Sequence, residues 1–436
     1  MLGKLKKISL SNWILIGMIL GLATGIILNF FVPDSFFKNI ILVDNIFYLG
    51  GSLFIKLMRM LVVPLVFCSI VVGAASISDI RKIGTIGGRT IGIYLITTAL
   101  AVTIALLIGI LVKPGAGLNM MAIAESSNVT LNQTMTDTIL NMVPDNPINS
   151  LASGDMIPVI IFALLIGVIL AKLKEETGIV SKFFAQGNRI MMEMTSIVMK
   201  FAPIGVFCLM ARTFAGLGVE GLLPLGKYII CVLIGLAIQA FIVYPSMMVI
   251  FTRLNPILFF KKFISVMFFA FSSSTSNATI PLNLDKLSQM GVSLEVSSFT
   301  IPLGATINMD GTAIMQGVAV MFAAQAYGMD LGLSALLTVI FTAVMASIGT
   351  AGVPSVGLVT LTMVFNSVGL PVQAIGIIFG IDHILDMFRT AVNVTGDAIC
   401  TIIVSFKNKS LDVDVFNGKK EMDKADKVLL DELSII

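Results

Sequence analysis

Long apolar stretches recur along the whole 436-residue chain, and they limit its possible folds more than any other feature. Each is about 20 residues long, which at 1.5 Å of rise per helical residue matches the roughly 30 Å hydrocarbon core of a bilayer. Hydrophobic residues make up 57% of the sequence and charged residues only 12%, a balance unlike that of soluble domains. The sequence therefore predicts an all-α polytopic membrane protein.

Six full spans are predicted before residue 256. They lie near residues 12–32, 45–76, 84–112, 155–172, 184–211 and 225–252. Basic residues cluster in alternate connecting segments, which by the positive-inside rule predicts that both termini are cytoplasmic. The four cysteines lie in apolar segments without paired spacing, which favours packed free thiols over disulfides or metal ligands.

Residues 256–406 break this simple pattern of spans. Two apolar segments that look too short to span, 264–270 and 335–346, run into the polar sequences FSSSTSNATIPLN and SIGTAGVPS. Lipid cannot satisfy the backbone groups of such tips, so the tips must be buried in protein or line a cavity. We therefore predict two re-entrant helical hairpins, each followed by a long helix with an interruption or a polar face, at 293–326 and 371–406. Paired broken segments of this kind are typical of the inverted repeats of secondary transporters.

A polar stripe runs along the last of these helices, in the sequence DHILDMFRTAVNVTGD. Its members are Asp382, Asp386, Arg389, Asn393 and Asp397. On an ideal helix they fall within an arc of roughly 80°. Charged groups at bilayer depth are costly, so partners, water or ligands must compensate them, and the excess of carboxylates favours bound cations with Asp397 as a direct ligand. Arg389 suits bidentate capture of an incoming carboxylate, although a purely structural ion-pair network is the alternative.

A second polar segment, PLGATINMDGTA at 302–313, predicts a break in its helix. Polar residues at every second position suit an extended crossing better than a helix, and Gly304 and Gly311 flank them. Unwound backbone frees carbonyl oxygens, which together with one carboxylate suit a hard monovalent cation. A structural kink filled by water is the alternative. The YLITT sequence and the SIGT tip are two further oxygen-rich patches.

The motifs SSSTSNATIP, GATINMDGTA, SIGTAGVPS and DHILDMFRTAVNVTGD, with FIKLMRMLVVPLVFCSIVVGAASIS before them, resemble those of the dicarboxylate/amino acid:cation symporter family, the prokaryotic relatives of glutamate transporters. The resemblance covers nearly the whole chain, residues 10–406. It implies a homotrimer in the lipid bilayer of the cell's inner membrane, with eight transmembrane helices and two re-entrant hairpins per protomer. It also implies an elevator mechanism, in which a transport domain moves against a fixed scaffold.

The organisation implied by the resemblance has five segments. These are scaffold helices 1 and 2 (1–76), transport-domain helix 3 (77–113), an extracellular loop with scaffold helices 4 and 5 (114–222), the rest of the transport domain from helix 6 through both hairpins to helix 8 (223–406), and a cytoplasmic tail (407–436).

When each motif is matched to the family pattern, the resemblance implies a set of substrate-binding residues. They are Ser274, Ser276, Thr312, Val353, Gly357, Asp386, Arg389, Thr390 and Asn393. Asp386 would take the amino group of the substrate and Arg389 its side-chain carboxylate, with Asp382 orienting Arg389.

The resemblance also implies that sodium is the coupling ion, at three sites. The first consists of Gly304, Asn308, Asn393 and Asp397; the second of Thr306, Met309, Ser347, Ile348 and Thr350; the third of Tyr94, Thr97, Thr98, Asn308 and Asp310.

Some positions depart from the family pattern. Members that take acidic amino acids usually carry a second arginine near the site, at positions occupied here by Ser274 and Met387, and Gln316 stands where proton-coupled relatives have a glutamate. The leading hypothesis is sodium-driven import of aspartate or glutamate. Alternatives are C4-dicarboxylates, cystine or neutral amino acids as substrate, proton coupling, or an ion channel.

Two other classes of protein are not supported by the sequence. A net charge of +3, scattered along the chain, does not make a nucleic-acid surface. No GxSxG or HExxH motif points to an enzyme.

Overall fold

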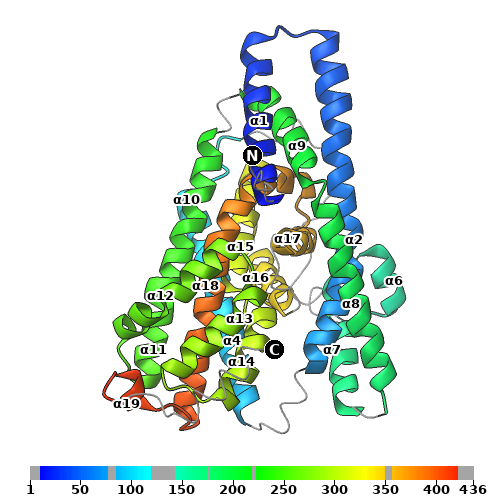
Figure 1. Ribbon diagram of the computed structural model, residues 1–436. Helices are drawn as coiled ribbons and strands as arrows, with labels where there is room; N and C mark the ends of the chain where they lie inside the picture. The colour runs from blue at the N-terminus through cyan, green and yellow to red at the C-terminus, as the bar shows by residue number, and fades with distance from the viewer. Residues whose placement is uncertain are drawn as a thin grey trace, which may run out of the picture.

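The computed structural model describes residues 10–76, 85–118, 143–154, 156–173, 176–218, 222–348 and 356–420 (Figure 1). Across these ranges the chain is almost entirely helical and forms no β-sheet, the exception being an isolated antiparallel bridge between Val292 and Leu411. The all-α prediction is therefore confirmed. All four cysteines are free, as expected.

The span predicted at 184–211 is divided into two helices that meet at a bend of 53°, and the other predicted spans lie close to helices of the structure. In chain order, the helices of the first half are α1 (Leu10–Phe31), the π-helix η1 (Phe37–Phe47), α2 (Tyr48–Ser76), α4 (Thr85–Val112), α6 (Pro147–Ser153), α7 (Met156–Leu173), α8 (Gly178–Met199), α9 (Ala202–Leu217), α10 (Leu222–Ile238), the π-helix η4 (Gln239–Val243) and α11 (Tyr244–Thr252).

The second half contains two helical hairpins and two long helical segments. Its elements are α12 (Pro256–Ser273), α13 (Ser276–Gln289), α14 (Leu294–Ile307), α15 (Asp310–Ala326), α16 (Leu333–Ser347), α17 (Val356–Ser367), the 3-10 turn η5 (Val372–Ala374), α18 (Ile375–Lys407) and α19 (Val413–Phe416). The arms of each hairpin, α12 with α13 and α16 with α17, pack against each other.

Several described helices are long and apolar enough to cross a membrane. Five meet both criteria: Phe37–Leu57, Ile86–Val112, Leu222–Thr252, Pro256–Ser273 and Ile384–Lys407. The pair α8 and α9, bent by 53°, would make a sixth. The prediction that the first arm of the first hairpin is too short to span is wrong, because α12 has 18 residues. It nevertheless turns back at Ser274 into α13, whereas α16 is short as predicted, with 15 residues.

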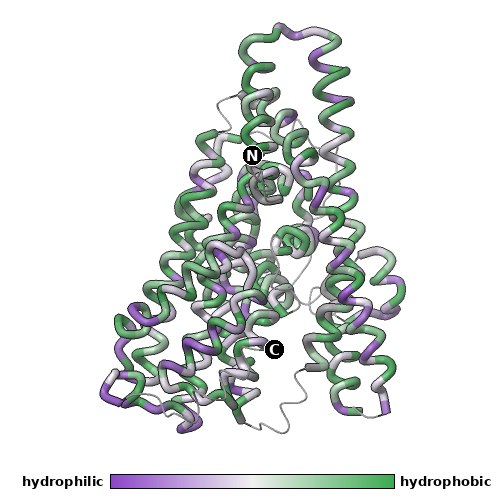
Figure 2. The backbone as a smooth tube through the Cα atoms, viewed as in Figure 1, coloured by the Kyte–Doolittle hydropathy of each residue, from purple (hydrophilic) through white to green (hydrophobic). Residues whose placement is uncertain are grey.

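The outer surface of the helices is apolar. Large hydrophobic side chains are strongly exposed on helices distant in sequence, for example Phe31, Leu111 and Ile179. Figure 2 shows hydrophobic residues along most of the helical tubes, with hydrophilic residues gathered near the lower end around α19. An apolar exterior of this kind is typical of a protein that faces lipid rather than water.

A row of glycines joins α1 closely to α9. Gly17, Gly21 and Gly25 recur every four residues on one face of α1. A Cβ added at Gly21 would lie 2.5 Å from the carbonyl oxygen of Phe207, and the other two glycines meet α9 backbone at similar distances. Small residues at this spacing let two helix backbones touch, which is the usual way that helices associate in membranes.

Two sets of helices pack mainly among themselves. In one set α2 contacts α7, α8 and α9, and in the other α15 contacts α4, α10, α16 and α18. Nearly every residue of α15 is buried, and α18 runs beside it through the middle of the molecule (Figure 1). The polar segments singled out in the sequence therefore meet in the interior.

Candidate functional site

The predicted break lies between α14 and α15. Asn308 and Met309 leave the helix with ψ angles of 81° and 50°, which turns backbone groups away from the helical hydrogen-bond ladder. The amide of Met309 donates a hydrogen bond to the Ser347 hydroxyl at 2.9 Å. The Ser347 hydroxyl in turn donates to the Ile307 carbonyl. The end of α16 thus closes over the break.

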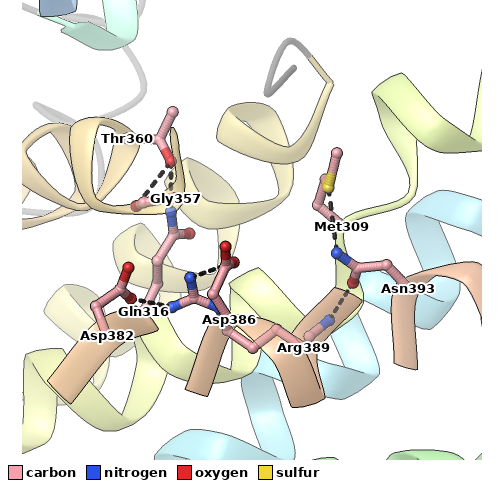
Figure 3. A network of polar contacts seen from close by, with 9 residues as sticks. Met309, Gln316, Gly357, Thr360, Asp382, Asp386, Arg389 and Asn393 are labelled. Carbon is pink, nitrogen blue, oxygen red and sulfur yellow. Dashed lines mark hydrogen bonds and ion pairs between the residues drawn. The ribbon is translucent and has the colours of Figure 1, made fainter. Parts of the chain in front are cut away.

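The first predicted sodium site is assembled around Asp397. The Asn308 side chain donates to Asp397 Oδ1 at 2.9 Å. Gly304 faces the same oxygen so closely that an added Cβ would stand 2.4 Å from it. Asn393 contacts the helix break instead, since its Oδ1 accepts the Gly311 amide at 2.7 Å and its Nδ2 contacts the sulfur of Met309 (Figure 3).

The third predicted site is assembled around Asp310, which is fully buried. Its Oδ1 accepts from Thr98 at 2.7 Å and lies 3.4 Å from the Thr97 hydroxyl, which is also 3.2 Å from Asn308 Oδ1. The carbonyl of Tyr94 lies 2.9 Å from both threonine hydroxyls.

Two residues that the sequence reasoning missed also hold Asp310. Its Oδ2 accepts from Gln239 Nε2 at 3.0 Å and from the Tyr244 hydroxyl at 2.8 Å. These residues are five apart, a spacing that an α-helix would place on different faces. The π-helix η4 between them adds one residue to the turn, and π-turns of this kind are common at functional sites.

The second predicted site is only partly described. Ser347 and Met309 are in contact as expected, and Ile348 packs in a small cluster with Leu303 and Ile307. Thr306 donates to the carbonyl of Leu303. Thr350 lies outside the described residues, as does Val353 of the substrate set.

Arg389 is completely buried and bridges two carboxylates of its own helix. Its Nη1 pairs with Asp382 and its Nη2 pairs with Asp386 at 2.6 Å (Figure 3). The predicted orienting contact with Asp382 is therefore present. The structure also pairs Arg389 with Asp386 directly, although the sequence reasoning gave these two residues separate partners on the substrate.

The second hairpin and α15 cover this ion pair. A Cβ added at Gly357 of α17 would lie 2.7 Å from the Thr312 side chain and 3.7 Å from Arg389 Nη2. Beside it, the Gln316 amide donates to Thr360 at 2.9 Å, and Thr360 donates to the Gly357 carbonyl at 3.1 Å. Gly357 and Thr312 therefore line the space next to the guanidinium.

The first hairpin approaches from the other side. Phe271 near the end of α12 packs edge-on against Phe388 of α18, with ring centroids 4.9 Å apart. Ser274 has a positive φ of 50° at the tip, and Ser276 begins α13, with both side chains buried. Thr390 is buried on α18.

Comparison with known proteins identifies the family. The sequence profile of the Sodium:dicarboxylate symporter family matches residues 10–406. This chain belongs to that family. It is 36% identical over 409 residues to a protein named Proton/sodium-glutamate symport protein from Bacillus caldotenax, with 92% of this chain and 95% of the relative covered.

Two further relatives carry other names. The chain is 32% identical over 412 residues to the Proton/glutamate-aspartate symporter of Escherichia coli (strain K12), covering 92% of this chain and 93% of the relative. It is 33% identical over 389 residues to Neutral amino acid transporter B(0) from Oryctolagus cuniculus, covering 81% and 72%. Family and relatives are transporters, so the chain is a membrane transporter of the symporter class and not an enzyme.

The charges in this symporter are unevenly compensated. Arg389 pairs with Asp382 and Asp386, whereas no lysine or arginine among the described residues forms an ion pair with Asp310 or Asp397. Neutral oxygens and amides surround both of these carboxylates. No cluster of three His, Cys, Asp or Glu exists in the described part of the chain, so the donor set fits a hard monovalent cation better than a transition metal.

Proposed function

We propose that this symporter imports an acidic amino acid, aspartate or glutamate, together with sodium ions. The observation that carries the substrate class is the buried pair of Arg389 and Asp386, 2.6 Å apart beneath Gly357 and Thr312. A neighbouring cation and anion match a ligand that carries both an ammonium group and an additional carboxylate.

Substrate binding would exchange this internal ion pair for two intermolecular pairs. Arg389 Nη2 would turn from Asp386 to the side-chain carboxylate of the substrate, and Asp386 would accept the ammonium group. Arg389 would keep its contact with Asp382 during the exchange, which holds the guanidinium plane in place. Thr312, Thr390, Asn393 and the tips of both hairpins would supply the remaining hydrogen bonds.

The charge balance supports coupling to cations. In their ionised forms Asp310, Asp382, Asp386 and Asp397 carry four negative charges against one positive charge on Arg389, and an acidic amino acid adds a further negative charge. Such an excess in a buried site is unfavourable unless cations enter with the substrate. Carboxylate, carbonyl and hydroxyl oxygens around Asp310 and Asp397 offer the ligands that sodium prefers.

Sodium is favoured over the proton as the coupling ion by Gln316. This residue lies beside the proposed substrate site and cannot carry a proton, and the resemblance to the family implies a glutamate at this position in proton-coupled members. The Bacillus caldotenax relative is named for both ions and the Escherichia coli relative for the proton alone, so proton coupling is the competing hypothesis.

A neutral amino acid is the second candidate substrate. Ser274 and Met387 occupy the two positions at which the resemblance implies a second arginine in members that take acidic amino acids. Among the described residues of the site, Arg389 is the one arginine that forms ion pairs. A relative that matches most of this chain is named as a neutral amino acid transporter. Transport of serine or alanine at the rate of aspartate would favour this alternative.

The division of the helices into two sets supports an elevator movement, and the family resemblance implies a homotrimer. The scaffold would be α1, α2 and α6 to α9, and the transport domain would be α4 and α10 to α18, with both termini in the cytoplasm and the chain in the inner membrane. In Figure 1 the α1–α2 connection lies at the top, and both sets reach the lower end, α7 and α8 on the right and α11 on the left. Hairpin arm α17 packs on α2 and α7, where it would slide.

One experiment separates these alternatives. Purified protein is placed in liposomes, and labelled aspartate, glutamate, serine, cystine and succinate are supplied under separately imposed sodium, potassium and proton gradients. We expect accumulation of aspartate or glutamate driven by the sodium gradient alone. Uptake driven by a proton gradient without sodium would overturn the coupling, and a substrate-independent current without accumulation would indicate a channel.

A further inference from the structure

The polar face of α18 continues beyond Asp397 toward the end of the helix. Thr401 and Ser405 follow at intervals of four residues, and both are fully buried. On α14, which packs against α18, Ser297, Thr300 and Gly304 share one face within an arc of roughly 60°, and Ser293 is the N-cap of this helix. We call Ser293, Ser297, Thr300, Thr401 and Ser405 the hydroxyl seam.

The seam is continuous with the proposed cation sites. Asp397 Oδ1 and the Tyr94 hydroxyl lie on the same side of Gly304, where an added Cβ would be 2.4 Å and 2.8 Å from them. Tyr94 donates to the carbonyl of Thr300 at 3.0 Å. The hydroxyls of Thr300 and Thr401 are 2.7 Å apart, so the seam residues of α14 and α18 meet directly below Asp397 along the two helices.

The other end of the seam reaches a loop at the end of the molecule that carries α19. Ser293 donates its amide to the carbonyl of Ser410, and Ser410 donates its amide to the carbonyl of Ser405. Lys407 and Lys409 flank this loop, and Lys261 and Lys262 lie near the start of α12. The positive-inside rule assigns this end to the cytoplasm.

Two hydroxyl groups of the seam have unused hydrogen-bonding capacity. The side chains of Ser405 and Ser293 have no hydrogen-bond partner among the described residues, although Ser405 is fully buried. Thr300 and Ser297 of the seam, like Thr395 outside it, donate to the carbonyl four residues earlier, so Ser405 and Ser293 differ from them. An unpaired buried hydroxyl lowers stability, so packing alone would favour alanine at position 405.

We infer that the hydroxyl seam is a route by which the coupling cation passes between Asp397 and the cytoplasm, separate from the pair of Arg389 and Asp386 where the substrate would bind. The inference rests on the proposed function. Neutral hydroxyl and carbonyl oxygens can replace part of the hydration shell of a sodium ion, but they bind the ion more weakly than a carboxylate does. An ion can pass along a series of such sites when each binds it well enough to admit it and weakly enough to release it. The packed seam opens when α14 separates slightly from α18.

The test compares Thr401→Val with two matched variants. Thr401→Ser keeps the hydroxyl, and Thr395→Val makes the same change on the same helix but on the opposite face from Asp397, away from the seam. Proteoliposomes with saturating sodium and aspartate on both sides are used to measure the exchange of radioactive sodium and of labelled aspartate. Under these conditions aspartate can exchange while the cations stay bound.

We expect Thr401→Val to slow sodium exchange by on the order of ten-fold, the effect of losing one oxygen contact at the barrier. Aspartate exchange should stay within about two-fold of the wild-type rate. The change in the free energy of substrate binding should be smaller than the contribution of one hydrogen bond. Thr401→Ser and Thr395→Val should behave as the wild type in both assays. Combined replacement with Ser405→Ala should slow sodium further.

Other outcomes overturn the inference. Equal rates in all variants would exclude the seam as a route, and parallel slowing of sodium and aspartate would assign Thr401 a structural role. Weaker sodium affinity without slower exchange would make Thr401 a ligand of the site itself. If the wild type exchanges aspartate but no sodium, no cation leaves the site through the seam and the inference fails. If aspartate exchange by the wild type is unchanged when choline replaces sodium on both sides, the proposed sodium coupling itself fails.

Discussion

Gln239 and Tyr244 both donate to Asp310 Oδ2, although they are five residues apart, because the π-helix η4 turns them to the same face. In an α-helix the same residues would diverge by about 140°. The extra residue in this turn therefore belongs to the proposed cation site rather than to the packing of α10.

The first prediction tests this relationship with a pair of tyrosines. Tyr244→Phe removes one donor from a buried carboxylate, so it should lower the free energy of unfolding in saturating sodium by about 1.5–3 kcal/mol. Tyr228→Phe is the matched control, since the buried Tyr228 hydroxyl has no hydrogen-bond partner among the described residues. Chemical denaturation followed by circular dichroism in detergent measures both variants. Equal losses for the two tyrosines would show that the bond to Asp310 contributes nothing.

Arg389 should decide whether a side-chain carboxylate is bound. Arg389→Ala leaves Asp382 and Asp386 without their shared cation and should reduce aspartate affinity by about 100-fold or more, because losing one partner of a buried pair costs about 3–5 kcal/mol. Isothermal titration calorimetry measures the affinity. Arg212→Ala is the control, since Arg212 pairs with Asp44, covers the Tyr48 ring and takes no part in the ion pairs of Arg389. Retained aspartate binding in Arg389→Ala would refute the assignment.

The glycine row of α1 should be sensitive to a single methyl group. In Gly21→Ala the new Cβ would meet the Phe207 carbonyl and Met210, so α1 must move away from α9, at a cost of about 1–3 kcal/mol. Gly92→Ala on α4 has open space around it and should be neutral or stabilising by about 0.5–1 kcal/mol. Thermal unfolding in detergent compares the two. A melting temperature for Gly21→Ala at or above that of Gly92→Ala would contradict this packing.

Much of the proposed site could be predicted from local patterns. The polar stripe at 382–397 follows from helical periodicity, and the break at 308–309 follows from polar residues at alternate positions between glycines. Both signals lie within a few residues of sequence, and each marks groups that an apolar environment would otherwise exclude.

Other contacts could not be predicted, because they depend on distant segments or on a local irregularity. Nothing in the run AIQAFIVYP indicates that its helix gains a residue per turn, so the sharing of Asp310 by Gln239 and Tyr244 was missed. The closure of Ser347 on Met309 joins residues 38 apart. The pairing of Arg389 with Asp386 was overlooked because each residue was matched to a substrate and not to its neighbour on the same helix.

The segment that follows α18 should respond to acid. Asp412 caps α19, and the amides of Val415 and Asp414 that donate to its carboxylate hold its pKa below the usual value. Because the folded pKa is lowered, the cap stabilises α19 above the unfolded pKa of about 4 and loses this effect as the pH falls through the folded pKa. Hydrogen-exchange protection of the two amides should therefore fall in acid. Asp412→Asn, a neutral cap, should remove the pH dependence, and an unchanged pH profile in that variant would contradict this explanation.

The last prediction concerns the coupling between cation and substrate. Asp397 accepts from Asn308, which also contacts Thr97 of the Asp310 site, and Asn393 joins the same group to the substrate side of α18. Cation binding would order the α14–α15 break and present Thr312 and Asn393 to the substrate, so each ligand should tighten the binding of the other by the same factor. Asp397→Asn removes one charge from the site and should weaken sodium binding by about ten-fold or more, equivalent to about 1.4 kcal/mol.

Substrate affinity in Asp397→Asn should fall at low sodium and recover partly as the sodium concentration is raised. The variant binds sodium more weakly, so at low sodium fewer molecules hold the cation that strengthens substrate binding. Aspartate is titrated at several sodium concentrations, with choline replacing sodium at constant ionic strength. Asp285→Asn on α13, whose carboxylate is bound by the exposed Gln289, is the control and should follow the wild-type curve. If aspartate binds the wild type equally well at every sodium concentration, the carboxylates at 310 and 397 do not bind the coupling ion. The charge excess around Arg389 must then be neutralised by protons.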